Sequence, residues 1–348
     1  MLLVTINVLK RIAIRIAIGI LTVSIVGVAT LMLMWRHRLQ LADVALRPAP
    51  VAAQQSNSVT ATWFGVTTLL FDDGETQILI DGFISRPTLP EILLQRPVDN
   101  DAAMIDYTLN EYRMGRLAAI IPVHTHFDHA MDIGAIANRS SASILGSESA
   151  ANIARGAGVP EDQIIVVSDG AEYSFGAFSV KMIESVHGPV GWRGQIPLAG
   201  SIDDPLVLPA PVVAWRAGRS YSIVISHPLG TTIVQGSTGF IEGALDEVQA
   251  DVVMLGVGLL EGLGHDYAQA YWQAVVTATG AQFVFPIHFD DYTRPYGEIE
   301  LIPKILDNFA ITVQWLEEFN AESDIDTQLY MPVFGQPIAL YPAESPEA

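Results

Sequence analysis

The longest apolar run in the chain lies close to its N-terminus. Residues 16–35 include no charged side chain, and a helix of this length rises about 30 Å, the hydrocarbon thickness of a bilayer. Basic residues flank the run on both sides, and Trp35 stands where an interfacial aromatic is expected. The pattern predicts a single-pass transmembrane anchor over residues 16–35, preceded by a short tail over residues 1–15.

A cleaved signal peptide is the main alternative to an anchor. Its apolar core is usually about 7–15 residues long, with a small-residue cleavage site close behind. Here the nearest such site, Val51-Ala52-Ala53, lies well beyond the apolar run. The pattern favours an uncleaved anchor but leaves open whether residues 1–53 are removed.

The orientation of the anchor depends on the charges that flank it. Lys10, Arg11 and Arg15 nearly balance the basic residues that follow the run. The very short N-terminal tail then favours a cytoplasmic N-terminus. We expect the rest of the chain to be extracytoplasmic, that is, periplasmic.

Beyond the anchor, the pattern predicts a linker and then one domain. Residues 36–57 contain Arg-Pro-Ala-Pro followed by Gln-Gln-Ser-Asn and are expected to form the linker. The domain is expected over residues 58–342, with a C-terminal tail over residues 343–348. Asp72-Asp73-Gly74-Glu75 is typical of a hairpin turn. Strands are expected at residues 60–64, 67–71, 77–80, 117–123, 143–145, 163–167, 178–183, 221–225, 232–235, 252–256 and 281–287.

Helical spacing of apolar residues appears between these strands. It is found at residues 128–138, 147–155, 267–279 and 302–319, whereas residues 84–105 are less regular. Ser147 is a natural N-cap, and Gly280 ends the third of these helices. Strands interleaved with helices in this way indicate an α/β domain whose sheets are covered by helices.

Composition narrows the chemistry that the domain can perform. The chain has no cysteine, which leaves His, Asp and Glu as the plausible metal ligands and excludes thiolate chemistry. The net charge is −20, and six of the 18 basic residues but only one of the 38 acidic residues lie in residues 1–50. The rest of the chain is therefore strongly acidic, and we expect no nucleic-acid partner.

The densest group of candidate ligands is His124-Thr125-His126-Phe127-Asp128-His129. In an extended segment, His124 and His126 point to the same side and can grip one ion together. Asp128 and His129 then lie at the turn into a helix, with reach to a second ion. Nitrogen and carboxylate ligands suit zinc, and also iron or manganese. The motif has a faint echo, because Phe-Pro-Ile-His288 ends an apolar strand much as Ile-Pro-Val-His124 does.

This segment resembles the His-x-His-x-Asp-His signature of the metallo-β-lactamase superfamily. Within it, the chain is most similar to the branch of ascorbate-6-phosphate lactonase-like proteins and N-acyl-phosphatidylethanolamine phospholipase D enzymes. Residues 63–67 (Trp-Phe-Gly-Val-Thr) and 78–82 (Ile-Leu-Ile-Asp-Gly) resemble the opening strands of that branch. The resemblance implies a four-layer αββα sandwich with its metals at one edge of the paired sheets.

The resemblance also implies a ligand set. The third and last motifs of the superfamily are matched by His187 and His288. The first ion would be held by His124, His126 and His187, and the second by Asp128, His129 and His288. His265 would line the site as a leaving-group contact, or else be a helix-capping loop residue.

The chain departs from the superfamily pattern at Ser237, which stands where a bridging Asp is usual. A hydroxyl is a poorer ligand for a dication than a carboxylate. One zinc ion, two zinc ions bridged by water, or compensation by Asp290 or Asp291 are all open, and two ions are favoured.

The resemblance implies a hydrolase that uses a metal-bound hydroxide on an ester, lactone or phosphodiester. Asp128 would orient the nucleophile or hold the second ion. The segment 188–211 follows His187 directly and could shape access for a small-molecule or lipid-derived substrate, with Trp192, Ile196, Leu198 and Leu206 as its apolar face. The alternatives are a packed surface loop for that segment, a metal-binding relative without hydrolase activity, and a β-lactamase.

Overall fold

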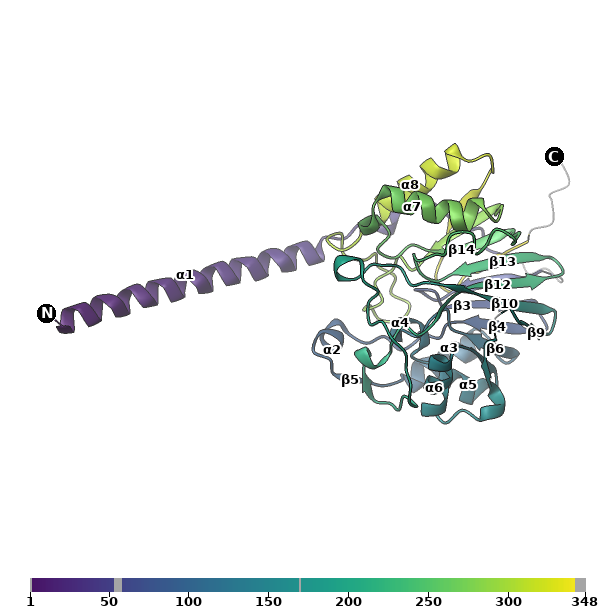
Figure 1. Ribbon diagram of the computed structural model, residues 1–348, viewed down its shortest axis with the longest axis horizontal. Helices are drawn as coiled ribbons and strands as arrows, with labels where there is room; N and C mark the ends of the chain where they lie inside the picture. The colour runs from purple at the N-terminus through teal and green to yellow at the C-terminus, as the bar shows by residue number, and fades with distance from the viewer. Residues whose placement is uncertain (1, 53–57, 169, 342–348) are drawn as a thin grey trace.

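Two β-sheets packed face to face, with helices on both outer faces, form the body of the protein (Figure 1). The computed structural model describes residues 2–52, 58–168 and 170–341, with only the helical backbone described for residues 2–9. The four-layer αββα arrangement is the one that the sequence predicted. The first sheet has the order β17 (Pro337–Ala339), β2 (Thr60–Trp63), β3 (Leu69–Asp72), β4 (Gln77–Ile80), β6 (Leu117–Ile121), β7 (Ser143–Gly146) and β8 (Ile164–Val166).

The second sheet, like the first, contains both parallel and antiparallel strand pairs. Its strands from β13 to β1 run parallel to one another, whereas β12, β10 and β9 pair antiparallel. The order is β1 (Arg47–Pro48), β16 (Gln328–Met331), β15 (Phe283–Ile287), β14 (Val252–Gly256), β13 (Gly230–Gln235), β12 (Ser220–His227), β10 (Phe178–Ser185) and β9 (Glu172–Phe175). A separate pair joins β5 (Pro97–Val98) to β11 (Ala210–Pro211).

The alternation of side chains along the strands decides which layer each residue joins. In β3, Leu69 and Phe71 face the space between the sheets, whereas Leu70 faces the helices on the outside. In β4, Ile78 and Ile80 likewise face inward and Leu79 outward. Because both faces are buried, these strands read as nearly continuous apolar runs, and each such side chain contributes about 1.5–3 kcal/mol through burial.

Helices cover the outer face of each sheet (Figure 1). Ser147 caps its helix as predicted by accepting a hydrogen bond from the Ala150 N–H. The helix expected at residues 128–138 is divided in two, since the N–H of Asp132 at the break donates to the carbonyl of Gly82 outside the helix. The carboxylate of Asp132 accepts hydrogen bonds from Ile84 and Ser85. The helices are α3 (Ala102–Glu111), α5 (Ile133–Ser140) and α6 (Glu148–Gly156) on one side, and α7 (His265–Trp272) and α8 (Phe309–Glu322) on the other, with the short α2 (Leu89–Leu93) and α4 (Phe127–Ala130) near the sheet edge.

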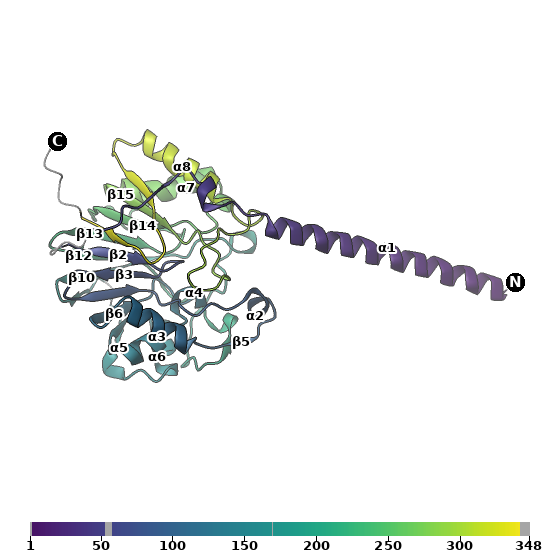
Figure 2. The ribbon, with the colours of Figure 1, turned by 180° about the vertical axis from the view of Figure 1, so that it is seen from behind.

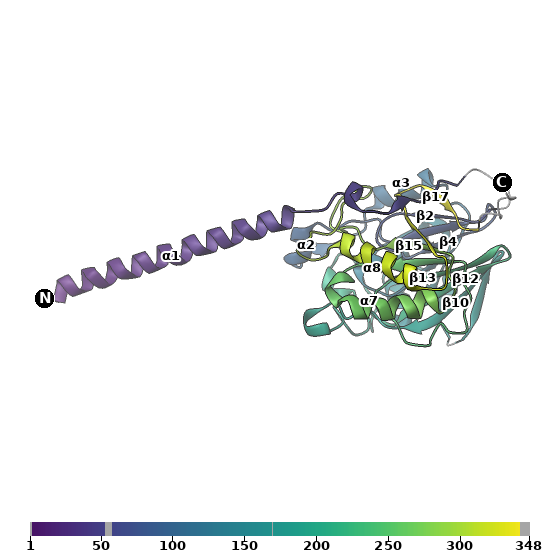
Figure 3. The ribbon, with the colours of Figure 1, turned by 90° about the horizontal axis from the view of Figure 1, so that it is seen from above.

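The N-terminal helix α1 (Leu2–Arg36) projects from one end of the sandwich (Figures 1 and 2). Residues Lys10–Arg36 are long and apolar enough to cross a membrane, and their apolar stretch is not buried by the rest of the chain. Viewed from above, α2 lies at the same end of the domain as the base of α1 (Figure 3).

The segment that follows α1 differs from the expected free linker. Val44, Leu46 and Ala49 are buried in the hydrophobic core that also contains residues of the strands, α7 and α8. β1 extends the second sheet by pairing with β16. The chain is therefore fixed to the domain almost as soon as the helix ends. The remainder of the expected linker, residues 53–57, and the C-terminal tail lie outside the described residues.

Gly156, at the end of α6, is in close contact with the segment 188–211. A Cβ at this position would lie 1.9 Å from the carbonyl oxygen of Leu206, and the Leu206 N–H donates to the carbonyl of Asn152. We predict that Gly156→Ala lowers the free energy of unfolding by about 1–3 kcal/mol, because backbone atoms must shift. Urea unfolding of the detergent-solubilised protein measures this difference.

Gly115→Ala is the matched control, because a Cβ there meets open space. It should leave the unfolding free energy within about 0.5 kcal/mol of the wild-type value. A Gly156→Ala variant as stable as the wild type would show that the segment does not rest tightly on α6.

Candidate metal centre

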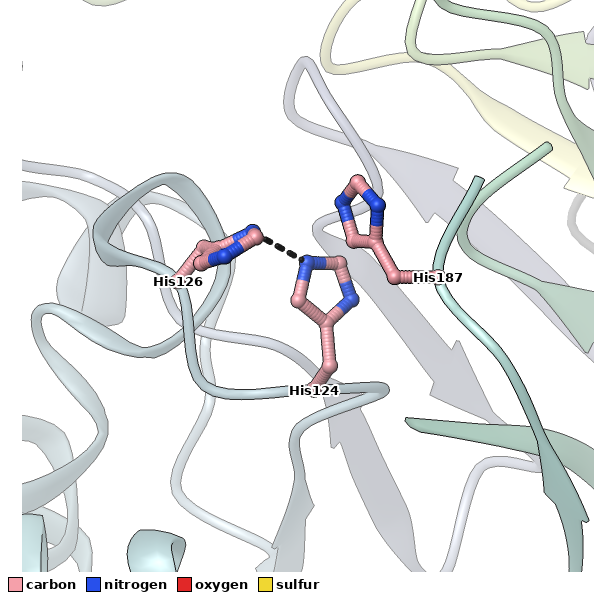
Figure 4. A group of neighbouring side chains, drawn as sticks. All are labelled: His124, His126 and His187. Atoms are coloured by element: carbon pink, nitrogen blue, oxygen red, sulfur yellow. Dashed lines mark hydrogen bonds between the residues drawn. The ribbon is translucent and has the colours of Figure 1, made fainter. Parts of the chain in front are cut away.

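Three histidines converge at the edge of the sandwich where β6 and β10 end (Figure 4). His124 and His126 follow β6 in an extended run, and His187 follows β10 from the opposite sheet. The Nε2 of His124 lies 3.0 Å from the Nδ1 of His126. The ring of His187 is 4.7 Å from that of His124 and 4.8 Å from that of His126, centroid to centroid. The structure thus brings the first predicted ligand group together.

Hydrogen bonds to main-chain carbonyls fix which ring nitrogens are free. The Nε2–H of His126 donates to the carbonyl of Pro197 at 2.9 Å, and the Nδ1–H of His187 donates to the carbonyl of Gly188 at 2.7 Å. A neutral imidazole carries one proton, so the Nδ1 of His126 and the Nε2 of His187 keep their lone pairs. Bonds of this kind are how proteins orient metal-binding histidines.

Burial keeps these imidazoles neutral. It lowers the pKa of His187 to about 3, with a further contribution from His126. Burial and the neighbouring histidines likewise lower the pKa of His124 well below its usual value, and burial lowers that of His126. Neutral imidazoles are metal ligands, whereas imidazolium ions are not, so the donor set fits a transition-metal ion.

The second predicted group lies beside the first. The Oδ2 of Asp128 is 3.6 Å from the Nε2 of His129 and 3.5 Å from the Nε2 of His288. The rings of His124 and His129 are only 3.9 Å apart, centroid to centroid. In each group the candidate ligand atoms lie within 4.8 Å of one another. The two groups form one centre with room for neighbouring ions.

Charges within the second group are mutually stabilised. Burial raises the pKa of Asp128, but the charges and hydrogen bonds of His129 and His288 outweigh it, so the pKa is lowered and the carboxyl is ionised. Burial lowers the pKa of His129, but Asp128 and Asp81 outweigh it and the pKa is raised. A metal cation in place of the proton on His129 would likewise balance the negative charge of Asp128.

Asp81 supports the second group, and sequence reasoning gave it no role. Its Oδ2 accepts the Nδ1–H of His129 at 2.7 Å and a hydrogen bond from the hydroxyl of Thr67, and its Oδ1 accepts the Val123 N–H at 2.8 Å. Asp81 adopts a left-handed backbone conformation, with φ of 58°. The Asp-Gly pair directly after β4 was the available signal, since both residue types tolerate that conformation.

Compensation for Ser237 by Asp290 or Asp291, one of the outcomes that the sequence left open, is not seen. Asp290 accepts from the N–H of Val66 and lies 3.9 Å from the guanidinium of Arg86. Asp291 accepts hydrogen bonds from the N–H and hydroxyl of Thr293 and pairs with Arg38 at 2.7 Å. Both carboxylates are therefore engaged elsewhere. The hydroxyl of Ser237 accepts a hydrogen bond from the N–H of Gly188 at 2.8 Å.

The structure does not bring His265 to the centre. Its ring packs against Trp315 and Phe319 of α8, and its Nε2 lies 3.6 Å from a carboxylate oxygen of Glu318. His265 starts α7, so its position agrees with a residue at a helix terminus. The expected leaving-group role was wrong because the loop before α7 faces the outer helix layer.

A cavity of about 350 Å³ opens above the centre, a size typical of small-molecule sites. His126, Asp128, His187 and His288 form its polar floor. Its walls are mostly apolar and include Leu89, Ile92, Val190, Leu198, Val212, Val213, Leu259, Ile302 and Leu306. Of the residues expected to form an apolar face on the segment 188–211, Leu198 lines this cavity, whereas Leu206 packs against the α6 side of the domain.

Tyr292 is a wall residue that the sequence did not reveal. It lies on the loop that follows His288, and its ring contacts that of Phe127. Burial, with a smaller contribution from Asp128, raises the pKa of Tyr292. The phenol therefore stays protonated and can donate a hydrogen bond within the cavity.

Comparisons with known proteins found distant sequence relatives and similar folds. No protein-family model matches the chain. A protein of Myxococcus xanthus named UPF0173 metal-dependent hydrolase is 26% identical over 259 residues, which cover 73% of this chain and 78% of that protein. A protein of Pyrobaculum islandicum with the same name is 22% identical over 234 residues, covering 66% of this chain and 84% of that protein. The metallo-β-lactamase fold protein YhfI from Bacillus subtilis is similar in structure, with a TM-score of 0.47 and 13% identity, over 80% of this chain and 98% of that one.

Topology, ligand groups and sequence relatives support one class. The sequence relatives are named metal-dependent hydrolases, and the four-layer αββα topology and the two candidate ligand groups of this chain support an enzyme of that class. The lactonase and phospholipase D branch named from the sequence stays a prediction.

We predict that Asp81→Asn weakens the second metal group selectively. Both carboxylate oxygens of Asp81 accept hydrogen bonds, so either orientation of an amide places its NH₂ against another donor. Metal affinity at the second group should fall about 10- to 100-fold, whereas the first group keeps its affinity. Titration of the apo-protein with Zn²⁺ in competition with a chelating dye measures both steps.

Asp73→Asn is the matched control, because Asp73 lies in the β3–β4 turn beside His227 and should leave both affinities unchanged. An equal loss at both groups, or no loss at either, would contradict the supporting role of Asp81.

Proposed function

We propose that this protein is a membrane-anchored zinc hydrolase that cleaves an ester, lactone or phosphodiester bond with the aid of two metal ions. The observation that carries the proposal is the pair of ligand groups at the floor of a largely apolar cavity. Imidazole and carboxylate donors favour zinc among the available metals. The anchor is α1, and we place the domain on the periplasmic side, as the very short N-terminal tail favours.

Each residue of the centre has a definable task. His124, His126 and His187 would hold the first ion, and Asp128, His129 and His288 the second. A divalent ion in such a site lowers the pKa of water towards neutrality and polarises an oxygen of the substrate. Asp128 is ionised and can also orient the attacking water, and the apolar walls exclude bulk solvent from it.

The leaving group needs a proton, which we assign to Tyr292. In hydrolysis the water oxygen bonds to the acyl carbon or phosphorus, the bond to the leaving oxygen breaks, and that oxygen gains a proton. A phenol whose pKa is raised by burial is held in its protonated form and can donate to the negative charge that develops. Tyr292 lines the cavity beside Asp128 and His288, whereas His265 does not.

A second candidate function is metal binding without hydrolysis. Ser237 motivates it, because a neutral hydroxyl replaces the usual bridging carboxylate. A panel of ester, lactone, phosphodiester and cephalosporin substrates, assayed on metal-loaded protein, distinguishes these functions. Bound metal without turnover on the whole panel would favour the second candidate, and cephalosporin turnover alone would favour a β-lactamase.

We predict that His126→Ala reduces turnover at least a hundredfold on every substrate that the wild type cleaves, because the first ion loses a ligand. Steady-state kinetics on the detergent-solubilised chain measures the loss. His227→Ala is the control, since His227 packs on Phe178 outside the cavity and should keep wild-type turnover. Full activity in the His126→Ala variant would refute the proposal.

We predict that Tyr292→Phe lowers kcat about 10- to 100-fold and changes KM little, because its hydroxyl acts on charge that develops in the transition state. Tyr107→Phe, at an exposed position on α3, is the control and should leave both constants unchanged. A rise in KM with kcat unchanged would instead assign Tyr292 to substrate binding.

A further inference from the structure

The end of α1 is clamped to the domain without a spacer. The carbonyl of His37 accepts the Lys304 N–H at 3.2 Å. The guanidinium of Arg38 donates to the carbonyl of Leu301 at 2.7 Å and pairs with Asp291 at 2.7 Å. Two residues after the candidate span, the chain is therefore already held by the segment 291–304.

The same segment forms a wall of the cavity. Asp291, Tyr292, Ile302 and Pro303 line it, and so does Trp35 in the last turn of α1. The final helical turn of the candidate span is thus part of the cavity wall. If α1 crosses a bilayer, the helix leaves the bilayer within one helical turn of the cavity, a distance of about 5 Å.

Exposed apolar side chains occur on three segments around this cavity. Leu93 and Leu94, at the end of α2, are 69% and 62% exposed, and Trp192 is 80% exposed. Ile305 and Leu306 are also exposed. Each of these lies within two residues of a cavity-lining residue, namely Ile92, Val190 or Leu306 itself. α2 and the base of α1 lie at the same end of the domain (Figures 1 and 3).

Basic side chains accompany these apolar residues, although the chain as a whole is strongly acidic. Arg36, Arg96, Arg193 and Lys304 are all exposed, and each lies within two residues of one of the apolar side chains or of Trp35. Arg193 also lies over the ring of Trp192. Glu91, the acidic residue of α2, is engaged with Thr88. Apolar side chains interleaved with basic ones are typical of a surface that contacts a membrane with anionic headgroups.

We infer that these residues form a membrane-contacting rim, and that the cavity opens onto the bilayer through it. The rim consists of Leu93, Leu94, Trp192, Ile305 and Leu306. Amphipathic substrates reach the metal centre from the bilayer, with their apolar chains passing the rim and their polar esters or phosphodiesters meeting the floor. This inference rests on the proposed function for its substrate and on α1 as a membrane span for its geometry.

The absence of cysteine from the chain allows the rim to be tested in the full-length protein. Leu94→Cys and Trp192→Cys each provide a single labelling position for an environment-sensitive fluorophore. Leu229→Cys is the control, because Leu229 is exposed in the turn between β12 and β13 and lines no part of the cavity. The labelled proteins are reconstituted into phosphatidylcholine and phosphatidylglycerol vesicles that contain nitroxide-labelled lipid.

Fluorophores at positions 94 and 192 should shift to the blue and be quenched at least twofold more strongly than the fluorophore at position 229. All three proteins carry the same anchor, so they do not differ in the amount of protein held at the vesicle. Equal quenching at the three positions would overturn the rim, and so would quenching confined to position 229.

Substrate access has a separate test. Leu94→Asp should reduce hydrolysis of an ester lipid in vesicles at least tenfold, because a carboxylate resists contact with the interface. Hydrolysis of a water-soluble short-chain ester should be unchanged, since Leu94 does not line the cavity. Equal loss for both substrates, or loss for neither, would contradict access from the bilayer. Quenching needs no turnover, so a quenched rim without hydrolysis of any ester, lactone or phosphodiester would contradict the proposed function alone.

Discussion

The whole centre depends on holding buried, neutral imidazoles with their lone pairs directed at a common point. Neutral histidines repel one another little, and a partner for the outward ring nitrogen offsets part of the cost of burying the ring. The carbonyls of Pro197 and Gly188 supply such partners for His126 and His187, and the carboxylate of Asp81 supplies one for His129, whose pKa is raised. These three outward hydrogen bonds fix both the tautomers and the positions of the inward-facing nitrogens.

The two sheets make this convergence possible. β6 and β15 lie in different sheets, and each pairs with parallel neighbours within its own sheet. A Pro-x-His sequence at the end of each strand places a histidine at the same edge of the sandwich. The loop after β10 brings His187 to the same place. Because the loops beyond these strands also build the cavity, one edge of the fold provides the ligands, the walls and the contact with α1. The tight attachment of Arg38 to Asp291 and Leu301 then relates the direction of the anchor to the position of the cavity.

Much of the fold and of the ligand set could be predicted from the sequence. β4 and β14 have the expected bounds, because buried apolar runs bounded by turn residues give a clear signal. The candidate ligands at positions 124–129 were predictable since four of six consecutive residues carry suitable donors. The remainder depended on long-range contacts. Asp81 gains its role only through His129, which lies 48 positions further along the chain. His265 was misplaced because position in the sequence does not reveal which layer a loop faces.

Local patterns also failed where secondary structure is short. β1 has two residues, and Val44, Leu46 and Ala49 are too few to show a period, so the segment after α1 resembled a linker. α3 buries only Ile105 and Thr108, and its amphipathic signal is correspondingly weak. Such elements are stabilised by the surfaces they pack on, and propensity contributes little to them.

We propose that the chain binds metal ions at the edge of the sandwich. A metal count by inductively coupled plasma mass spectrometry, on full-length protein incubated with Zn²⁺ and then dialysed, tests this proposal. We expect about two equivalents of zinc per chain. A chain that retains no zinc after dialysis would contradict it.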